Sequence, residues 1–163
     1  MPLSKHHIDT KATDTLFDVE SLAARLEAEL PQVVFAYLYG SAASSGVVAA
    51  HSDLDIAIFV EPTIWNARSG AVAEAGAAAP LAWDTIYDTV YRVAESIVPG
   101  VRCDLGILNG TEPVFRFEVL KGRLLFCRDQ EQWLRFYSIT SREYESQLFH
   151  YEKQRRYRLE AQS

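Results

Sequence analysis

Four segments of the chain show the signals of an α-helix. In the first, the apolar residues Leu22, Leu26 and Leu30 recur at intervals of four, which is the spacing of one helix face. Two later segments repeat apolar residues in the same way, and the last of them is long, aromatic and basic at its end. A short helix lies between Pro113 and Gly122, residues that favour its start and its end. The predicted helices cover residues 18–30, 81–98 and 113–122, and continue from about residue 129 to the C-terminus.

Apolar runs between these helices predict β-strands. The run VVFAYLY, residues 33–39, is typical of a strand buried on both faces, whereas DLDIAIFV, residues 53–60, alternates as a half-buried strand does. VRCDLGIL, residues 101–108, predicts a third strand, and RLLFCRD adds a brief extended piece. The Ala- and Gly-rich segment 67–80 is expected to be a loop or a weak helix. We predict an α/β (α+β) fold with a mixed sheet flanked by helices.

Length and composition indicate one folded domain. The chain has 163 residues, of which 48% are hydrophobic and 23% charged, as in ordinary globular proteins. We expect residues 1–15, which are polar and aperiodic, to be a disordered tail, and residues 16–163 to form the domain. A net charge of -6 disfavours direct binding of nucleic acid. Neither an apolar leader nor a membrane span is present, and the two cysteines form no Cys-x-x-Cys motif, so we expect a cytoplasmic protein.

The first predicted strand runs directly into a Gly-Ser pair, Gly40 and Ser41. A strand that enters a helix at such a pair gathers a hydroxyl group and free backbone N–H groups, which together suit a phosphate. Simpler roles are open as well, since glycine permits a tight turn and serine caps a helix. The pair is therefore a candidate phosphate site that depends on what lies beside it.

Three aspartates interrupt the next two strands. Asp53 and Asp55 are two residues apart, so a strand places both carboxylates on one face, roughly 6.5–7 Å apart. Asp104 lies inside an apolar run, where an unpaired buried charge is costly. Crowded carboxylates favour a cation such as Mg²⁺, although a solvent-facing sheet edge and a salt-bridged strand end are the simpler interpretations. Together with a phosphate site, three carboxylates match two-metal phosphoryl transfer from a nucleoside triphosphate.

The segment GSAASSGVVAAHSDLDIAIF, residues 40–59, resembles the Gly-Ser and Asp-x-Asp signature of the DNA-polymerase-β-type nucleotidyltransferase superfamily. VRCDLGILN, residues 101–109, resembles the strand that carries the third aspartate of that family. Residues 114–147 resemble the corresponding part of MNT antitoxins, which are minimal nucleotidyltransferases paired with HEPN toxins. The resemblance spans roughly residues 18–150 and implies a polymerase-β-like nucleotidyltransferase core with a long C-terminal helix.

The resemblance also implies a reaction. Gly40 and Ser41 would hold the β- and γ-phosphates of ATP. Asp53 and Asp55 would ligate both of two Mg²⁺ ions, and Asp104 would ligate one ion and act as general base. An acceptor hydroxyl would attack the α-phosphorus in line, and pyrophosphate would leave. In MNT antitoxins the acceptor is a tyrosine of the HEPN ribonuclease, so we expect a HEPN toxin as partner, a hetero-oligomer with it, and silencing of the toxin by AMP.

Two features depart from the pattern of the family. Ser44 stands where arginine is common, which removes a phosphate contact. Eleven residues, 42–52, separate Ser41 from Asp53 where the family often has ten, so the turn near Gly46 must absorb one residue. Neither departure removes a metal ligand.

Two other functions fit the same residues. A small-molecule nucleotidyltransferase of the aminoglycoside-modifying type shares the motif, but such enzymes usually add a helical domain for which this chain has little room. An antitoxin that acts by binding and occlusion would leave its nucleotide site idle. Neutralisation that survives Asp53→Asn would support occlusion, and neutralisation that disappears would support catalysis.

Overall fold

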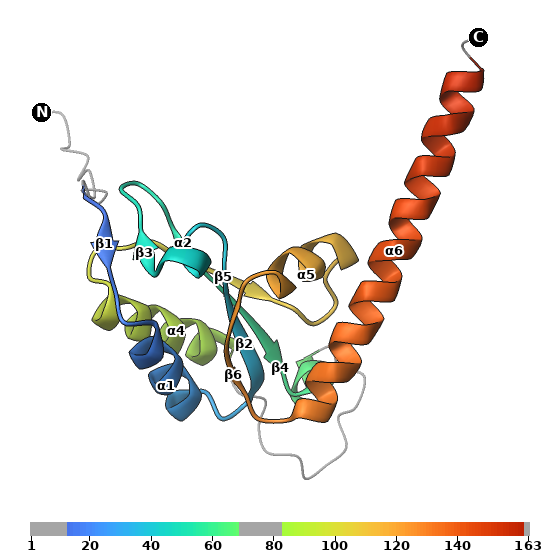
Figure 1. Ribbon diagram of the computed structural model, residues 1–163. Helices are drawn as coiled ribbons and strands as arrows, with labels where there is room; N and C mark the ends of the chain where they lie inside the picture. The colour runs from blue at the N-terminus through green and yellow to red at the C-terminus, as the bar shows by residue number, and fades with distance from the viewer. Residues whose placement is uncertain (1–12, 69–82, 162–163) are drawn as a thin grey trace, which may run out of the picture.

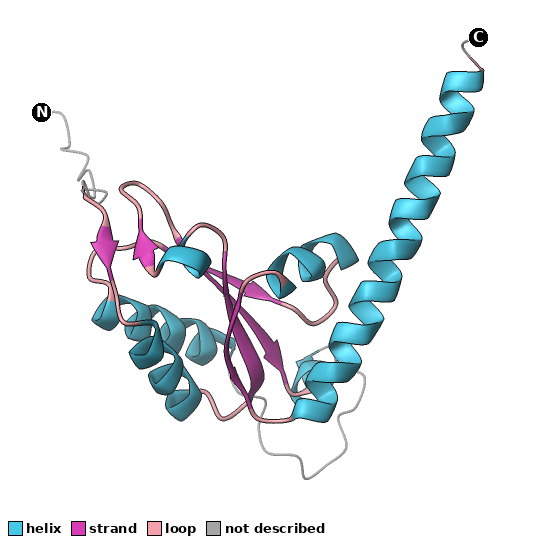
Figure 2. Ribbon diagram, viewed as in Figure 1, coloured by secondary structure: helices cyan, strands magenta, loops and turns pink. Residues whose placement is uncertain are grey.

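The computed structural model describes residues 13–68 and 83–161, and its main sheet has helices on both faces (Figures 1 and 2). The predicted tail lies outside the described residues up to residue 12, and so does most of the Ala-rich segment, residues 69–82. The elements in chain order are β1 (Thr15–Leu16), α1 (Val19–Glu29), β2 (Val33–Tyr39), α2 (Ala42–Ser45), β3 (Val47–Val48), β4 (Leu54–Val60), α3 (Pro62–Arg68), α4 (Trp83–Ile97), β5 (Cys103–Ile107), α5 (Pro113–Leu120), β6 (Arg123–Cys127) and α6 (Gln130–Glu160).

The main sheet has four strands in the order β5-β4-β2-β6. β2 is antiparallel to both of its neighbours, and β4 and β5 are parallel, so the sheet is mixed as predicted. The central position of β2 explains its unbroken apolar run, because helices cover it on both faces.

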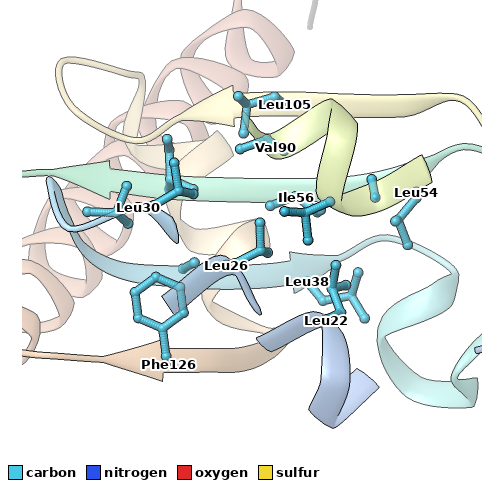
Figure 3. Packing of buried hydrophobic residues seen from close by; sticks show 14 of the residues in the cluster. Leu22, Leu26, Leu30, Leu38, Leu54, Ile56, Val90, Leu105 and Phe126 are labelled. Atoms are coloured by element: carbon cyan, nitrogen blue, oxygen red, sulfur yellow. The ribbon is translucent and has the colours of Figure 1, made fainter. Parts of the chain in front are cut away.

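One face of the sheet packs against α1 and α4. Leu22 and Leu26 of α1 are fully buried there, with Ile56 of β4 and Val90 of α4 in the same cluster (Figure 3). Leu26 and its neighbours in α1 follow the predicted spacing of four, which confirms the first helix and its inward face. This cluster is the larger of the two hydrophobic cores of the described residues.

The other face of the sheet packs against α5 and the first half of α6. Phe35, Phe59 and Phe136 meet there, with ring centroids of Phe35 and Phe59 4.8 Å apart. Side chains alternate between the two faces along β4, so Ile56 points to α1 and α4 while Ala57 belongs to the cluster on the opposite face. Asp55 therefore lies on the face of α5 and α6.

Three short elements were not predicted. α3 follows directly after β4, and its seven residues are too few to show a helical repeat. β1 and β3 pair in a separate two-stranded sheet, in which Thr15 faces Val48. Thr15 is therefore part of a strand, although the tail was expected to extend to residue 15. None of the helices in the described parts of the chain has the length and apolarity to cross a membrane.

Candidate functional site

The turn that follows β2 is built around Gly40. Its φ is +70°, a left-handed conformation that glycine adopts readily, and a Cβ atom at this position would lie only 2.3 Å from Oδ2 of Asp55. Ser41 comes next and occupies the N-cap position of α2, but its side chain makes no capping hydrogen bond. Glycine is thus required here both by the backbone and by the close approach of the Asp55 carboxylate.

The sheet brings two of the three aspartates side by side. Asp55 on β4 is in register with Asp104 on the parallel strand β5, and with Tyr39 on β2 at its other side. Asp53 lies just before β4, on the same side of the strand as Asp55 by the alternation of side chains. Asp53 and Asp55 are half-buried, whereas Asp104 is exposed to solvent.

Negative charge accumulates where these strands meet. Burial raises the pKa of the Asp55 carboxyl, and the neighbouring charges of Asp104 and then Asp53 raise it further. Burial also raises the pKa of Tyr39 to about 12, with the Asp55 and Asp104 carboxylates adding to the shift. The thiol of Cys103 shows the same trend, with a pKa of about 12 caused mainly by burial. A cation is the ligand that would relieve this crowding.

The carboxylates are not arranged as a complete set of metal ligands. Within residues 13–68 and 83–161, no three Asp, Glu, His or Cys side chains are grouped closely enough to hold an ion. Oδ1 of Asp53 lies 4.0 Å from Nε of Arg102, a residue whose side chain is 80% exposed. Asp55 and Asp104 thus form an adjacent pair. Asp53 is near enough to raise the pKa of Asp55, and it also faces the Arg102 guanidinium. The oxygen donors suit a hard divalent cation such as Mg²⁺.

A hollow opens beside the Gly40 turn. Its volume is about 500 Å³, and it is lined by Gly40, Ala43, Ser44, Glu118, Lys121, Gly122 and Arg123. Lys121 and Arg123 flank Gly122, where a Cβ atom would lie 2.3 Å from the carbonyl oxygen of Leu38. Glycine at 122 thus lets the start of β6 approach β2, and this contact brings two cations to the turn.

Sequence reasoning missed these two cations. Lys121 pairs with Glu118 at 2.6 Å and Arg123 pairs with Glu20, and the four side chains are each about half exposed or more. Exposed ion pairs of this kind are weak, so an anionic ligand can displace the carboxylates. The only signal in the sequence was a basic residue on either side of a glycine, which becomes informative once β6 is known to pair with β2.

Comparison with protein families agrees with this arrangement. The family model described as "Polymerase beta, Nucleotidyltransferase" matches residues 20–131. The chain belongs to the polymerase beta nucleotidyltransferase family. The matched region of this nucleotidyltransferase contains the Gly40 turn, all three aspartates and the hollow beside the turn.

Several solved structures share the fold of this nucleotidyltransferase. A mutant MntA–HpeT toxin–antitoxin complex contains a chain with a TM-score of 0.54 and 18% identity, over 88% of this chain and 96% of that chain. A toxin–antitoxin structure with AMP-PNP gives the same four values, 0.54, 18%, 88% and 96%. A Shewanella oneidensis complex of a tri-AMPylated HEPN toxin with an MNT antitoxin gives 0.50 and 18%, over 87% and 93% of the two chains. No curated protein sequence matches the chain.

The longer segment between Ser41 and Asp53 is also accounted for. Gly46 ends α2 with φ +64°, and β3 then pairs with β1 before a turn in which His51 has φ +63°. The extra residue of this nucleotidyltransferase therefore lies in a segment with its own small sheet. The adjacent pair of Asp55 and Asp104 is formed despite it.

Proposed function

We propose that this nucleotidyltransferase is an antitoxin that neutralises a HEPN ribonuclease toxin by transferring AMP from ATP to a tyrosine of the toxin. Membership of the polymerase beta nucleotidyltransferase family supports the reaction type. The shared fold with complexes that contain AMP-PNP or a tri-AMPylated HEPN toxin supports the nucleotide and the partner. The observation that carries the proposal is the pair of Asp55 and Asp104 in register, with the Asp55 carboxylate against the Gly40 turn.

In this proposal Asp53, Asp55 and Asp104 hold two Mg²⁺ ions. The raised pKa of Asp55 reflects burial and mutual repulsion of the carboxylates, both of which bound cations would offset. Bound Mg²⁺ would supply charge neutralisation at the attacking and leaving oxygens of an in-line displacement. Asp53 would have to exchange its contact with Arg102 for the metal, which is an inexpensive change because both side chains are exposed enough to be solvated.

The triphosphate of ATP would lie along the Gly40 turn and into the adjacent hollow. Gly40 and Ser41 offer the turn and the start of α2, and the Ser41 hydroxyl is not used as a cap. Lys121 and Arg123 line the same hollow and would contribute the positive charge that the family often supplies from the position of Ser44. The hollow of about 500 Å³ is of the size of a nucleotide-binding pocket.

Asp104 would accept the proton of the attacking tyrosine. Its side chain is exposed, so a hydroxyl group presented by a second protein can reach it. The proton leaves the tyrosine oxygen as that oxygen bonds to the α-phosphorus and pyrophosphate departs. Tyr39 lies next to the same acids, and burial raises the pKa of its phenol to about 12.

A mass shift of the toxin tests the proposal. The purified chain is incubated with its HEPN partner, ATP and Mg²⁺, and the intact mass of the partner is measured. We expect addition of one or more AMP units with the wild type, and no addition with Asp55→Asn. Asp88→Asn on α4 is the matched control, because it removes an exposed aspartate from a helix that covers the opposite face of the sheet. An unmodified partner with wild-type chain would contradict the proposal.

A further variant, Asp53→Asn, separates catalysis from occlusion. Neutralisation of the toxin is measured as protection of its RNA substrate, with wild-type chain and with Asp53→Asn. Catalytic neutralisation needs ATP and is lost in the variant, whereas occlusion needs neither ATP nor the aspartate. Modification of an aminoglycoside instead of the toxin would assign the chain to the small-molecule enzymes.

A further inference from the structure

The C-terminal helix leaves the body of the protein part-way along its length. α6 packs against α5 as far as Tyr144, whose ring stacks on Phe117 with centroids 3.9 Å apart. Residues 145–160, which we call the overhang, are all exposed, and Figure 1 shows this part of α6 projecting past α5. Because its side chains are all exposed, burial against a second surface would add to the stability of the overhang.

An apolar stripe runs along one side of the overhang. The exposed fractions are 45% for Leu148, 71% for Tyr151 and 58% for Leu159. These residues continue the line of Tyr137 and Tyr144 at separations of seven, four, three and eight residues, which keep side chains on one helix face. The exposed apolar side chains share this face with Arg155, which lies between Tyr151 and Leu159, and such a face is typical of an interaction surface.

The charged side chains beside this stripe would form ion pairs between two copies of the helix that lie antiparallel. Glu145 and Arg156 border the same edge of the stripe. Glu145 precedes His150 in the sequence, and Arg156 follows it at almost the same separation. The last turns are strongly basic, with Lys153, Arg155, Arg156 and Arg158. When two α6 helices cross head to tail about residue 150, Glu145 of each copy meets Arg156 of the other. In a parallel pair the basic ends would meet and repel each other.

We propose that two copies of the chain pair antiparallel through their overhangs. Around the twofold axis, Leu148 of one copy packs on Tyr151 of the second copy. The face of the Tyr144 ring that is turned away from Phe117 then receives the guanidinium of Arg155 of the second copy, a favourable cation–π pair. Small Ser141 leaves room for Leu159 of the second copy. The stripe and the charge pattern thus select the same register.

The pairing is expected to be of moderate strength. The overlap from Ser141 to Leu159 is about 28 Å long at 1.5 Å per residue, and it holds two symmetric Glu145–Arg156 ion pairs. A short apolar seam with solvated ion pairs predicts a dissociation constant on the order of micromolar, weakened by salt. This inference uses only α6 and does not depend on the proposed AMP transfer.

A charge-swap series tests the pairing. Sedimentation equilibrium of the full chain, from low to several hundred micromolar, should show a monomer–dimer equilibrium. Glu145→Arg and Arg156→Glu should each weaken the dimer about tenfold or more, because like charges then meet twice. The double variant restores both ion pairs in reverse and should recover the wild-type constant. Glu131→Arg is the matched control, since it makes the same charge change outside the overlap and should leave the dimer unchanged.

Several results would overturn the inference. These are a wild-type chain that stays monomeric at all concentrations, single variants that dimerise like the wild type, and a double variant that is not restored. A chain that is monomeric alone, but whose complex with the toxin is weakened by Glu145→Arg, would assign the overhang to a different protein. Circular dichroism of each variant confirms that the helix is formed.

Discussion

Replacing Gly40 by alanine tests whether the turn after β2 and the Asp55 carboxylate act as one unit. The left-handed backbone of Gly40, at φ +70°, costs an alanine about 1–2 kcal/mol. The new Cβ atom would lie 2.3 Å from Oδ2 of Asp55, whereas real Cβ atoms stay beyond 3.0 Å, so carboxylate and turn must separate by 0.7 Å or more (3.0 minus 2.3). A displacement of this size at a catalytic group can lower a rate about 100-fold.

Gly100→Ala is the control for backbone strain. Gly100 has φ +74°, and nothing lies within 4 Å of the position of its Cβ. Gly100→Ala should therefore lose only the stability that backbone strain removes, seen as a fall in Tm of about 2–8 °C, and Gly40→Ala should lose at least as much. Only Gly40→Ala should lose AMP transfer to the toxin, by about two orders of magnitude.

The assay combines thermal unfolding, followed by circular dichroism, with the initial rate of AMP transfer, followed by intact mass. Equal transfer rates in Gly40→Ala and Gly100→Ala would refute the reasoning, because the contact with Asp55 would then have no effect on the reaction. A large loss of transfer in both variants would point to strain and not to the site.

Three further predictions concern stability. Burial and then the charge of Asp104 raise the pKa of Asp55. A carboxyl group with a higher pKa in the folded than in the unfolded state lowers the stability of the protein as the pH rises from its unfolded-state pKa through its folded-state pKa. Asp104→Asn should therefore stabilise the ligand-free chain at pH 7 by on the order of 0.5 kcal/mol, and an unchanged or lower Tm would contradict this. Asn109→Ala should lower the free energy of unfolding in urea by about 2–4 kcal/mol, because the buried amide accepts a hydrogen bond from the Val60 N–H at 2.8 Å and donates one to the Val60 C=O at 2.9 Å. A loss under about 0.5 kcal/mol would show that those backbone groups find other partners. Leu26→Ala should cost about 2–5 kcal/mol in the same assay, since Leu26 is fully buried, and a surface-like cost would place it outside the core.

Elements with a strong repeat were predictable from the sequence. β2 and β4 follow from an unbroken apolar run and from a clear alternation, and α1 follows from three leucines spaced by four. The long helix α6 was predicted from about residue 129 and begins at Gln130, after the N-cap Asp129. In β2, β4 and α1, and in the packed first half of α6, burial in the core both favours apolar residues and stabilises the element.

Features that depend on tertiary contacts were not predictable. Asn109 lies at the end of β5 in the sequence, but its role is to close the end of β4, which only the pairing of the two strands reveals. Lys121 and Arg123 reach the Gly40 turn because Gly122 lets two backbones approach. The contact of Asp53 with Arg102 likewise joins two different loops, and no pattern in the sequence indicates it.

The position of the label in ATP tests the central claim most directly. The wild-type chain is incubated with its HEPN partner, Mg²⁺ and ATP that carries radiolabelled phosphorus at either the α or the γ position. Attack on the α-phosphorus predicts a labelled toxin with α-labelled ATP alone, and no label in either case with Asp55→Asn. Label from the γ position, or equal α-labelling by the Asp55→Asn chain, would contradict nucleotidyl transfer at this site.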